Sequence, residues 1–287
     1  MGKYFGTDGF RGEANKTLTA GHAYKVGRFL GWYYGELKRR AGDAASPRVV
    51  IGKDTRRSSY MFEYALVAGL TASGADAYLL HVTTTPSVAY IARVDSFDCG
   101  IMISASHNPY YDNGIKLING QGEKIDEKTI ALVENYLDGK LEVFGRQWAE
   151  VPYAEGEKIG RTVDYVSGRN RYIGYLISLG MYSFKGVKVG LDCANGSSWN
   201  IAKAVFDALG ATTYRTQRAE HQRERGLDAY RGTSEVRRGE GAGRRLCLRR
   251  RRGQMPLRRR NGRNRQRRSY HVSLRPLYEG AGKAGDE

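Results

Sequence analysis

A change in charge after Tyr214 divides this 287-residue chain into two parts that cannot fold in the same way. Residues 215–287 contain 22 basic and 8 acidic residues, a net charge of +14, and 21 of the 22 basic residues are arginine. Residues 1–214 contain 25 basic and 22 acidic residues and are nearly neutral. Large aliphatic side chains are sparse after Tyr214 while like charges crowd, so we expect 215–287 to be a disordered tail without a packed core.

Composition and cysteine usage exclude several classes of protein. Hydrophobic residues make up 40% of the chain, as in ordinary globular proteins, and no apolar run approaches the roughly 18 residues of a membrane span. The first ten residues lack a secretory signal pattern, so we expect a cytoplasmic protein without a membrane partner. Cys99, Cys193 and Cys247 are scattered and odd in number, which favours reduced thiols over a disulfide framework or a metal site.

Residues 1–140 alternate between helical and strand-like patterns, which predicts a first α/β domain. Apolar residues recur at helical spacing in 17–40, 61–73 and 126–137, a Pro-broken helix lies near 88–94, and short apolar runs occupy 49–51, 77–82 and 100–104. Repeated β-α-β units favour a mixed, mainly parallel sheet covered by helices. His22, within the first helical segment, is interpreted as structural.

The pattern predicts only part of a second α/β domain, in residues 155–214. The polar segment 139–160 resembles a linker, and it is followed by a helix at 163–179, a strand at 187–191 and a helix at 201–209. One such unit is too small for an independent α/β domain, whose sheet needs both faces covered. The second domain is therefore expected to be truncated at Tyr214.

The segment Ile103–Pro109 follows a buried strand and carries candidate catalytic groups. In α/β sheets, ligands bind at the loops beyond the carboxyl ends of strands. Here the loop presents the Ser106 hydroxyl and the His107 imidazole, with the Lys116 ammonium ten residues after Ser106. These groups suit a nucleophilic or phosphorylated serine beside a lysine base. The alternative is a polar turn capped by Asn108 and proline.

Two other segments contain arginine in turn-forming sequence. Residues 6–12 are glycine-rich and include Arg11, which suits the binding of a phosphate by backbone amides and a guanidinium. Residues 53–59 include Arg56 and Arg57 and are interpreted either as an anion-binding loop or as a solvated turn. Two arginines in a turn are more often solvated.

Four motifs in order resemble the α-D-phosphohexomutase superfamily, and within it the bacterial phosphoglucosamine mutases. The motifs are FGTDGFRG at 5–12, GKDTRRSS at 52–59, TTTPSVAY at 83–90 and GIMISASHNPYYDNGIKL at 100–117. The resemblance covers about residues 3–214. In that family, four α/β domains surround a cleft. The resemblance implies that this chain holds domain I at 1–140 and a partial domain II at 155–214.

The resemblance also implies a reaction and its residues. Ser106 would be the phosphoserine that gives its phosphoryl group to glucosamine 6-phosphate and takes one back from a hexosamine bisphosphate, yielding glucosamine 1-phosphate for UDP-N-acetylglucosamine synthesis. Lys116 would act as acid and base, Arg11 would stabilise phosphate, and His107 would lie beside the centre or order the loop. Phosphomannomutase and phosphoglucomutase activities are the alternatives, because sugar choice depends on a third domain that this sequence lacks.

The family binds Mg²⁺ through the phosphate on this serine and three aspartates of an Asp-Gly-Asp-Ala-Asp-Arg loop in domain II. That loop is absent from this sequence, as are the sugar loop of the third domain and the phosphate loop of the fourth. We therefore expect an incomplete Mg²⁺ site at Ser106 and a chain that is inactive as it stands.

The basic tail has two interpretations. A non-catalytic α/β domain could carry it as an arm that binds nucleic acid non-specifically through phosphate contacts. The ratio of 21 arginines to one lysine instead indicates an out-of-frame translation, because GC-rich aspartate and glycine codons become arginine codons when read one base early. With suitable synonymous codons, Arg245–Pro256 read one base later becomes Gly-Phe-Ala-Tyr-Asp-Gly-Asp-Ala-Asp-Arg-Cys, which contains the missing loop.

Overall fold

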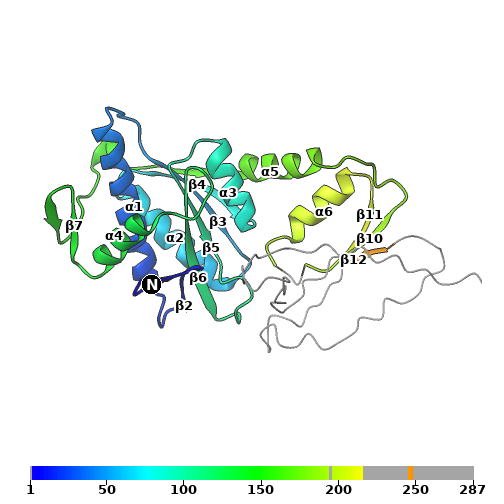
Figure 1. Ribbon diagram of the computed structural model, residues 1–287, viewed down its shortest axis with the longest axis horizontal. Helices are drawn as coiled ribbons and strands as arrows, with labels where there is room; N and C mark the ends of the chain where they lie inside the picture. Colours follow the sequence, from blue (N-terminus) through cyan, green and yellow to red (C-terminus); the bar gives the residue numbers. More distant parts are fainter. Residues whose placement is uncertain (1, 194–195, 216–244, 248–287) are drawn as a thin grey trace, which may run out of the picture.

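The computed structural model describes residues 2–193, 196–215 and 245–247 (Figure 1). The helices are α1 (Ala20–Arg40), α2 (Arg57–Thr71), α3 (Thr85–Val94), α4 (Glu127–Leu137), the 3₁₀ helix η1 (Gly156–Lys158), α5 (Val166–Ser178) and α6 (Trp199–Ala208). The strands are β1 (Phe5–Gly6), β2 (Gly9–Glu13), β3 (Arg48–Lys53), β4 (Asp76–Val82), β5 (Cys99–Ile103), β6 (Asp112–Asn119), β7 (Leu141–Val143), β8 (Arg146–Trp148), β9 (Thr162–Asp164), β10 (Lys188–Leu191), β11 (Thr212–Arg215) and β12 (Arg245–Cys247).

The main sheet is mixed and has the strand order β1-β2-β6-β5-β3-β4-β9. Strands β5, β3, β4 and β9 pair in parallel, whereas β1, β2, β6 and β5 pair antiparallel along the other half. The antiparallel half follows from chain length, because residues 104–111 between β5 and β6 are too few for the crossover of a dozen or more residues that a parallel pair needs. The α/β class predicted from the sequence is confirmed.

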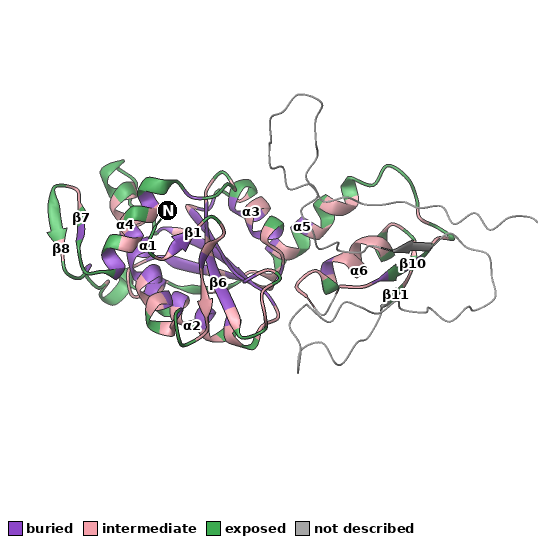
Figure 2. Ribbon diagram, turned by 60° about the horizontal axis from the view of Figure 1, so that its bottom comes forward, coloured by how far each residue is buried: buried purple, intermediate pink, exposed green. Residues whose placement is uncertain are grey.

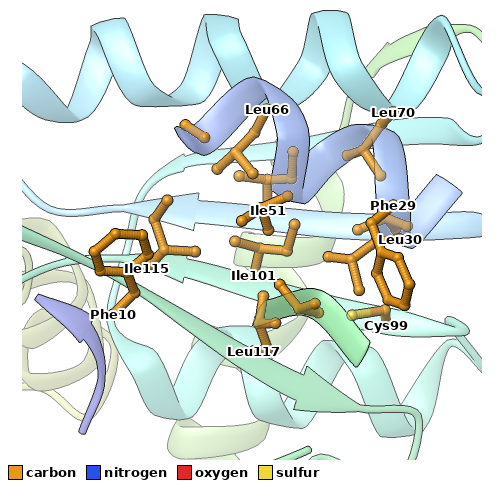
Figure 3. Packing of buried hydrophobic residues seen from close by; sticks show 14 of the residues in the cluster. Phe10, Phe29, Leu30, Ile51, Leu66, Leu70, Cys99, Ile101, Ile115 and Leu117 are labelled. Atoms are coloured by element: carbon orange, nitrogen blue, oxygen red, sulfur yellow. The ribbon is translucent and has the colours of Figure 1, made fainter. Parts of the chain in front are cut away.

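Helices cover both faces of the central strands. Side chains alternate along β3, so Val49 and Ile51 join a core cluster with Leu66 of α2, while Val50 joins a second cluster with Ile91 of α3. Figure 3 shows Ile51 packed beneath the helices of the first cluster, and Figure 2 shows the buried residues concentrated on the strands of this sheet. This burial on two sides explains why these strands are continuous apolar runs in the sequence.

Helices α1 and α3 begin where their local chemistry predicts. The Thr19 Oγ1 accepts a hydrogen bond from the His22 backbone N–H, and His22 Nδ1 accepts one from the Thr19 N–H, both at 3.2 Å. Burial, with a smaller contribution from Lys25, lowers the pKa of His22 and favours the neutral ring that can accept this bond. Pro86 lies in the first turn of α3, where a missing N–H costs nothing, so this helix is continuous and not broken by proline.

Residues 139–160 differ from the expected linker, because they pack against the first domain. They form the β7–β8 hairpin and a following segment in which Val151 is buried. The Arg28 side chain, almost fully buried on α1, donates to the backbone oxygens of Val151 and Pro152. Trp148 packs edge-on against Trp32 of α1, with ring centroids 4.8 Å apart. Polar composition concealed this packing because only a few apolar side chains of the segment are buried and the other contacts use backbone oxygens.

Strand β9 extends the first sheet although it lies within residues 155–214, the range expected to form the second domain. It pairs in parallel with β4, and the Ala77 N–H donates to the Arg161 oxygen at 2.8 Å. The buried Asp76 carboxylate accepts from the Arg161 backbone N–H and guanidinium, each at 2.7 Å. The first sheet therefore extends to Asp164.

We expect Asp76→Asn to weaken the fold above pH 4 and to remove part of its acid sensitivity. Burial alone would raise the pKa of Asp76, but hydrogen bonds from Arg161 hold it below its usual value. A carboxyl whose pKa is lower in the folded than in the unfolded state stabilises above the unfolded pKa of about 4, and this contribution is lost as the pH falls through the folded pKa. Urea unfolding of Asp76→Asn and of the parent chain, measured from pH 3 to 7, should show that the variant loses about 2 kcal/mol of the free energy of unfolding at pH 7 and less at pH 3. Glu142→Gln, at an exposed position, is the control, and equal effects of the two variants would contradict the prediction.

A small parallel sheet, in the order β11-β10-β12, follows α5. Strand β10 and helix α6 match the strand and helix predicted at 187–191 and 201–209. Within the tail, the structure describes only Arg215 at the end of β11 and the three residues of β12. Strand β12 is not predicted from the sequence. It pairs with β10 through main-chain groups, which every non-proline residue has. The expected disorder of 215–287 otherwise falls outside the described residues.

Candidate active site

The loop 104–111 leaves β5 at the carboxyl end of the parallel strands and holds Ser106 in a left-handed backbone conformation. Ser106 has φ +61°, which is uncommon for a residue with a side chain. Its N–H donates to Ser104 Oγ at 3.0 Å, and the Ser104 N–H donates to the Gly114 oxygen on β6 at 2.8 Å. Hydrogen bonds to the adjacent strand therefore tie the start of the loop to the sheet.

Strand register places Arg11 and Lys116 on the same face of the sheet. Arg11 on β2 lies opposite Gly114 on β6, and Lys116 is two residues farther along β6. Residues directly opposite each other in an antiparallel pair share a face, as do residues two apart on one strand. Ile115 between them points the other way, into the core. The antiparallel half of the sheet thus presents two cationic side chains beside the Ser106 loop.

Two glycines make room for these cations. A Cβ atom at Gly114 would lie 2.9 Å from the Ser104 oxygen and 3.0 Å from Arg11 Cγ, so only glycine lets the Arg11 side chain cross β6. Gly9 has φ +94°, and a Cβ there would lie 2.4 Å from the Ile115 oxygen. The glycines of the motifs at 5–12 and 100–117 thus allow close approach of side chain and backbone.

Arg11 and His107 both contact groups of the loop. The Arg11 guanidinium lies 3.3 Å from Asp8 Oδ2 and donates to Asn108 Oδ1 at 3.5 Å. His107 is exposed, and its Nδ1 lies 3.4 Å from the Ser106 Oγ. Ser106, His107 and Arg11 are therefore brought together, with Lys116 on the same face as Arg11.

The sequence leaves Arg56 either in an anion-binding loop or in a solvated turn, and in the structure the Arg56 side chain is not solvated. The Arg56 side chain is only 10% exposed and donates to backbone oxygens of the Ser106 loop. Its Nε donates to Asp54 Oδ2 at 2.9 Å. The signal that could have found Arg56 is the aspartate two residues before it, because a carboxylate so placed can fix a guanidinium. Arg57, the next residue, is exposed.

The arrangement suits chemistry on a phosphate. A hydroxyl lies on a strand-end loop with a guanidinium and an ammonium on the adjoining sheet face. Phosphoryl transfer asks a protein chiefly for positioning and for positive charge near the equatorial oxygens.

Comparison with known proteins identifies the class. Residues 2–143 match the family model described as phosphoglucomutase/phosphomannomutase, alpha/beta/alpha domain I. A Phosphoglucomutase/phosphomannomutase family protein from Burkholderia thailandensis shares the fold, with a TM-score of 0.58 and 24% identity, over 74% of this chain and 43% of that one. The N-terminal part of this chain belongs to the phosphohexomutase family.

Curated relatives narrow the assignment within the family. The phosphoglucosamine mutase of Lachnospira eligens is 72% identical over 214 residues, which are 75% of this chain and 45% of that protein. The phosphoglucosamine mutase of Caldicellulosiruptor bescii is 47% identical over 212 residues, 74% of this chain and 44% of that protein. The matched part is similar to the N-terminal portion of these phosphoglucosamine mutases, and the chain spans less than half the length of these relatives.

The family implies the use of Mg²⁺, but the described residues do not assemble a site for it. Among residues 2–193, 196–215 and 245–247, no group of three or more His, Cys, Asp or Glu side chains is placed to hold a metal ion. Within these ranges, the three aspartates that the resemblance requires are not gathered beside Ser106. In the same part of the chain, no helix is both long and apolar enough to cross a membrane.

Proposed function

We propose that this chain carries the phosphoserine centre of a cytoplasmic phosphoglucosamine mutase, an isomerase that interconverts glucosamine 6-phosphate and glucosamine 1-phosphate. The observation that carries the proposal is the juxtaposition of the Ser106 loop with the face that presents Arg11 and Lys116. The high identity to curated phosphoglucosamine mutases supports the choice of sugar.

The proposed reaction moves one phosphoryl group out and another back. A hydroxyl of the sugar phosphate attacks the phosphorus of phospho-Ser106, the bond from phosphorus to Ser106 Oγ breaks, and a bisphosphate forms. The bisphosphate then reorients in the site. Ser106 Oγ takes the other phosphoryl group, and the isomeric monophosphate is released. In each transfer, Lys116 takes the proton from the attacking hydroxyl and returns it to the oxygen that leaves phosphorus, and Arg11 stabilises the charge on the equatorial oxygens. His107, 3.4 Å from Ser106 Oγ, orders the serine side chain.

We also propose that residues after about 214 are read out of frame. The arginine excess of 215–287 and the recovered Asp-Gly-Asp-Ala-Asp-Arg sequence support a shift of one base. Sequencing the DNA tests this directly: an intact reading frame without a displaced downstream mutase sequence would overturn it. We call the protein encoded after correction of that base the restored enzyme.

The restored enzyme tests the proposed activity. We expect it to form glucosamine 1-phosphate from glucosamine 6-phosphate when supplied with Mg²⁺ and a catalytic amount of glucosamine 1,6-bisphosphate. Its kcat/KM should exceed that for glucose or mannose 6-phosphate by at least about tenfold, because specificity is a difference in transition-state binding. A preference for mannose or glucose 6-phosphate would move the assignment to another phosphohexomutase activity, and no turnover of any of them would contradict the proposal.

A further inference from the structure

The guanidinium of Arg56 connects the β3–α2 turn to the backbone of the Ser106 loop. Its two terminal nitrogens donate to three backbone oxygens of that loop: the Ser106 oxygen at 3.2 Å, the Asn108 oxygen at 2.9 Å and the Pro109 oxygen. Its Nε donates to Asp54 at 2.9 Å. A planar guanidinium has five N–H donors in a fixed fork, so one side chain can hold several acceptors in a set geometry.

Asp54 holds Arg56 in place. Asp54 Oδ1 accepts from the Arg56 backbone N–H at 3.0 Å and from Ser59 Oγ at 2.7 Å, while Asp54 Oδ2 accepts from the guanidinium. The Asp54 N–H donates to the Ile103 oxygen at 2.9 Å, at the end of β5. Asp54 and Ser59 are buried, so the anchor of the guanidinium is part of the core of the domain.

These contacts fix Ser106 from both sides. The N–H of Ser106 is bound by Ser104 Oγ and its oxygen is bound by Arg56. A non-glycine residue at positive φ persists only when its surroundings determine it, and these two bonds restrain both peptide groups of Ser106. The direction of the Ser106 Oγ depends on that backbone conformation.

We propose that Arg56 is a positioning residue, which holds the Ser106 loop in the conformation that presents the serine hydroxyl for phosphoryl transfer. The proposal has two parts. The structural part, that Arg56 orders the loop, rests on the Arg56 contacts alone. The chemical part, that this order serves phosphoryl transfer, rests on the proposed function of Ser106. Lysine cannot replace arginine here, because a single ammonium cannot reach Asp54 and three loop oxygens together.

The structural part is tested on the 287-residue chain, without sugar or phosphate, by amide hydrogen exchange measured with mass spectrometry. We expect Arg56→Lys to speed exchange in peptides covering 104–112 at least about tenfold, because loss of the clamp opens the loop locally. Peptides from α1 should exchange as in the parent chain, which separates a local effect from global unfolding. Arg57→Lys, which changes the exposed neighbouring arginine in the same way, is the matched control. Equal protection of 104–112 in the two variants would overturn the proposal.

The chemical part is tested on the restored enzyme by separating kcat from KM. Arg56→Lys should lower kcat about 100-fold with little change in KM, because misplacing a reacting group costs mainly the chemical step. Arg57→Lys should retain both constants. If Arg56→Lys keeps its kcat while Ser106→Ala is inactive, the positioning role is wrong and the proposed function stands. If Ser106→Ala keeps full turnover, the proposed function is wrong, and the exchange experiment alone then decides whether Arg56 orders the loop.

Discussion

In the restored enzyme, Ser106→Ala is expected to lower kcat for glucosamine 6-phosphate at least about 10⁴-fold, because it removes the atom that carries the phosphoryl group between substrates. The alanine lacks only the hydroxyl, and the loop retains its bonds to Ser104 and Arg56 through backbone atoms. The fold should therefore be preserved. Steady-state turnover, with circular dichroism to verify folding, measures the effect.

The matched control for this variant is Ser46→Ala, at an exposed serine outside all four motifs. Its kcat should equal that of the parent. A Ser106→Ala enzyme within about tenfold of the parent would show that the hydroxyl does not carry the phosphoryl group, since loss of a covalent nucleophile costs far more.

The 287-residue chain is expected to turn over at least about 1000-fold more slowly than the restored enzyme, even though it contains Ser106, Lys116 and Arg11. The sequence lacks the loops with which the family binds the sugar and its distal phosphate, so the substrate is not positioned for transfer. If the residues after about 214 are out of frame, arginines also stand where the restored sequence has three aspartates, and guanidinium groups repel a cation. Each 1.36 kcal/mol of lost transition-state stabilisation costs about tenfold in rate.

Side-by-side assays of the two proteins, with Mg²⁺ and bisphosphate present, check this expectation. Protease-resistant fragments and thermal melting should show that residues of the first sheet are folded in both. Comparable turnover would show that 215–287 is functional protein and that the frame proposal is wrong.

Hydrophobic periodicity predicts helices α1 to α4 and the three central parallel strands β3, β4 and β5. Runs such as Val49–Ile51 are buried on both faces, and that burial is what makes them apolar in sequence. Strand β6 was not predicted, and its antiparallel direction depends on the length of the loop before it and not on side-chain pattern. Strand β9 was missed for a related reason: three residues are too few to show a period, and its place depends on the Asp76–Arg161 pair.

The sequence indicates the candidate residues Ser106, His107 and Lys116, but not Arg56, which contacts the Ser106 loop. Ser106, His107 and Lys116 stand out because hydroxyl, imidazole and ammonium groups follow a buried strand. Arg56 does not stand out, because its function depends on backbone oxygens 50 or more residues away. Every residue has a backbone oxygen, so a contact with one cannot be recognised from residue types.

In the proposed function, phosphate resides on Ser106 and passes to the sugar. We would incubate the restored enzyme with glucosamine 1,6-bisphosphate and Mg²⁺, remove the small molecules, and map the phosphate by mass spectrometry of the peptide that contains residues 100–117. The account predicts one phosphate on Ser106, which is lost on addition of glucosamine 6-phosphate with formation of the bisphosphate. A phosphate on another residue, or a phosphate on Ser106 that glucosamine 6-phosphate does not remove, would contradict it.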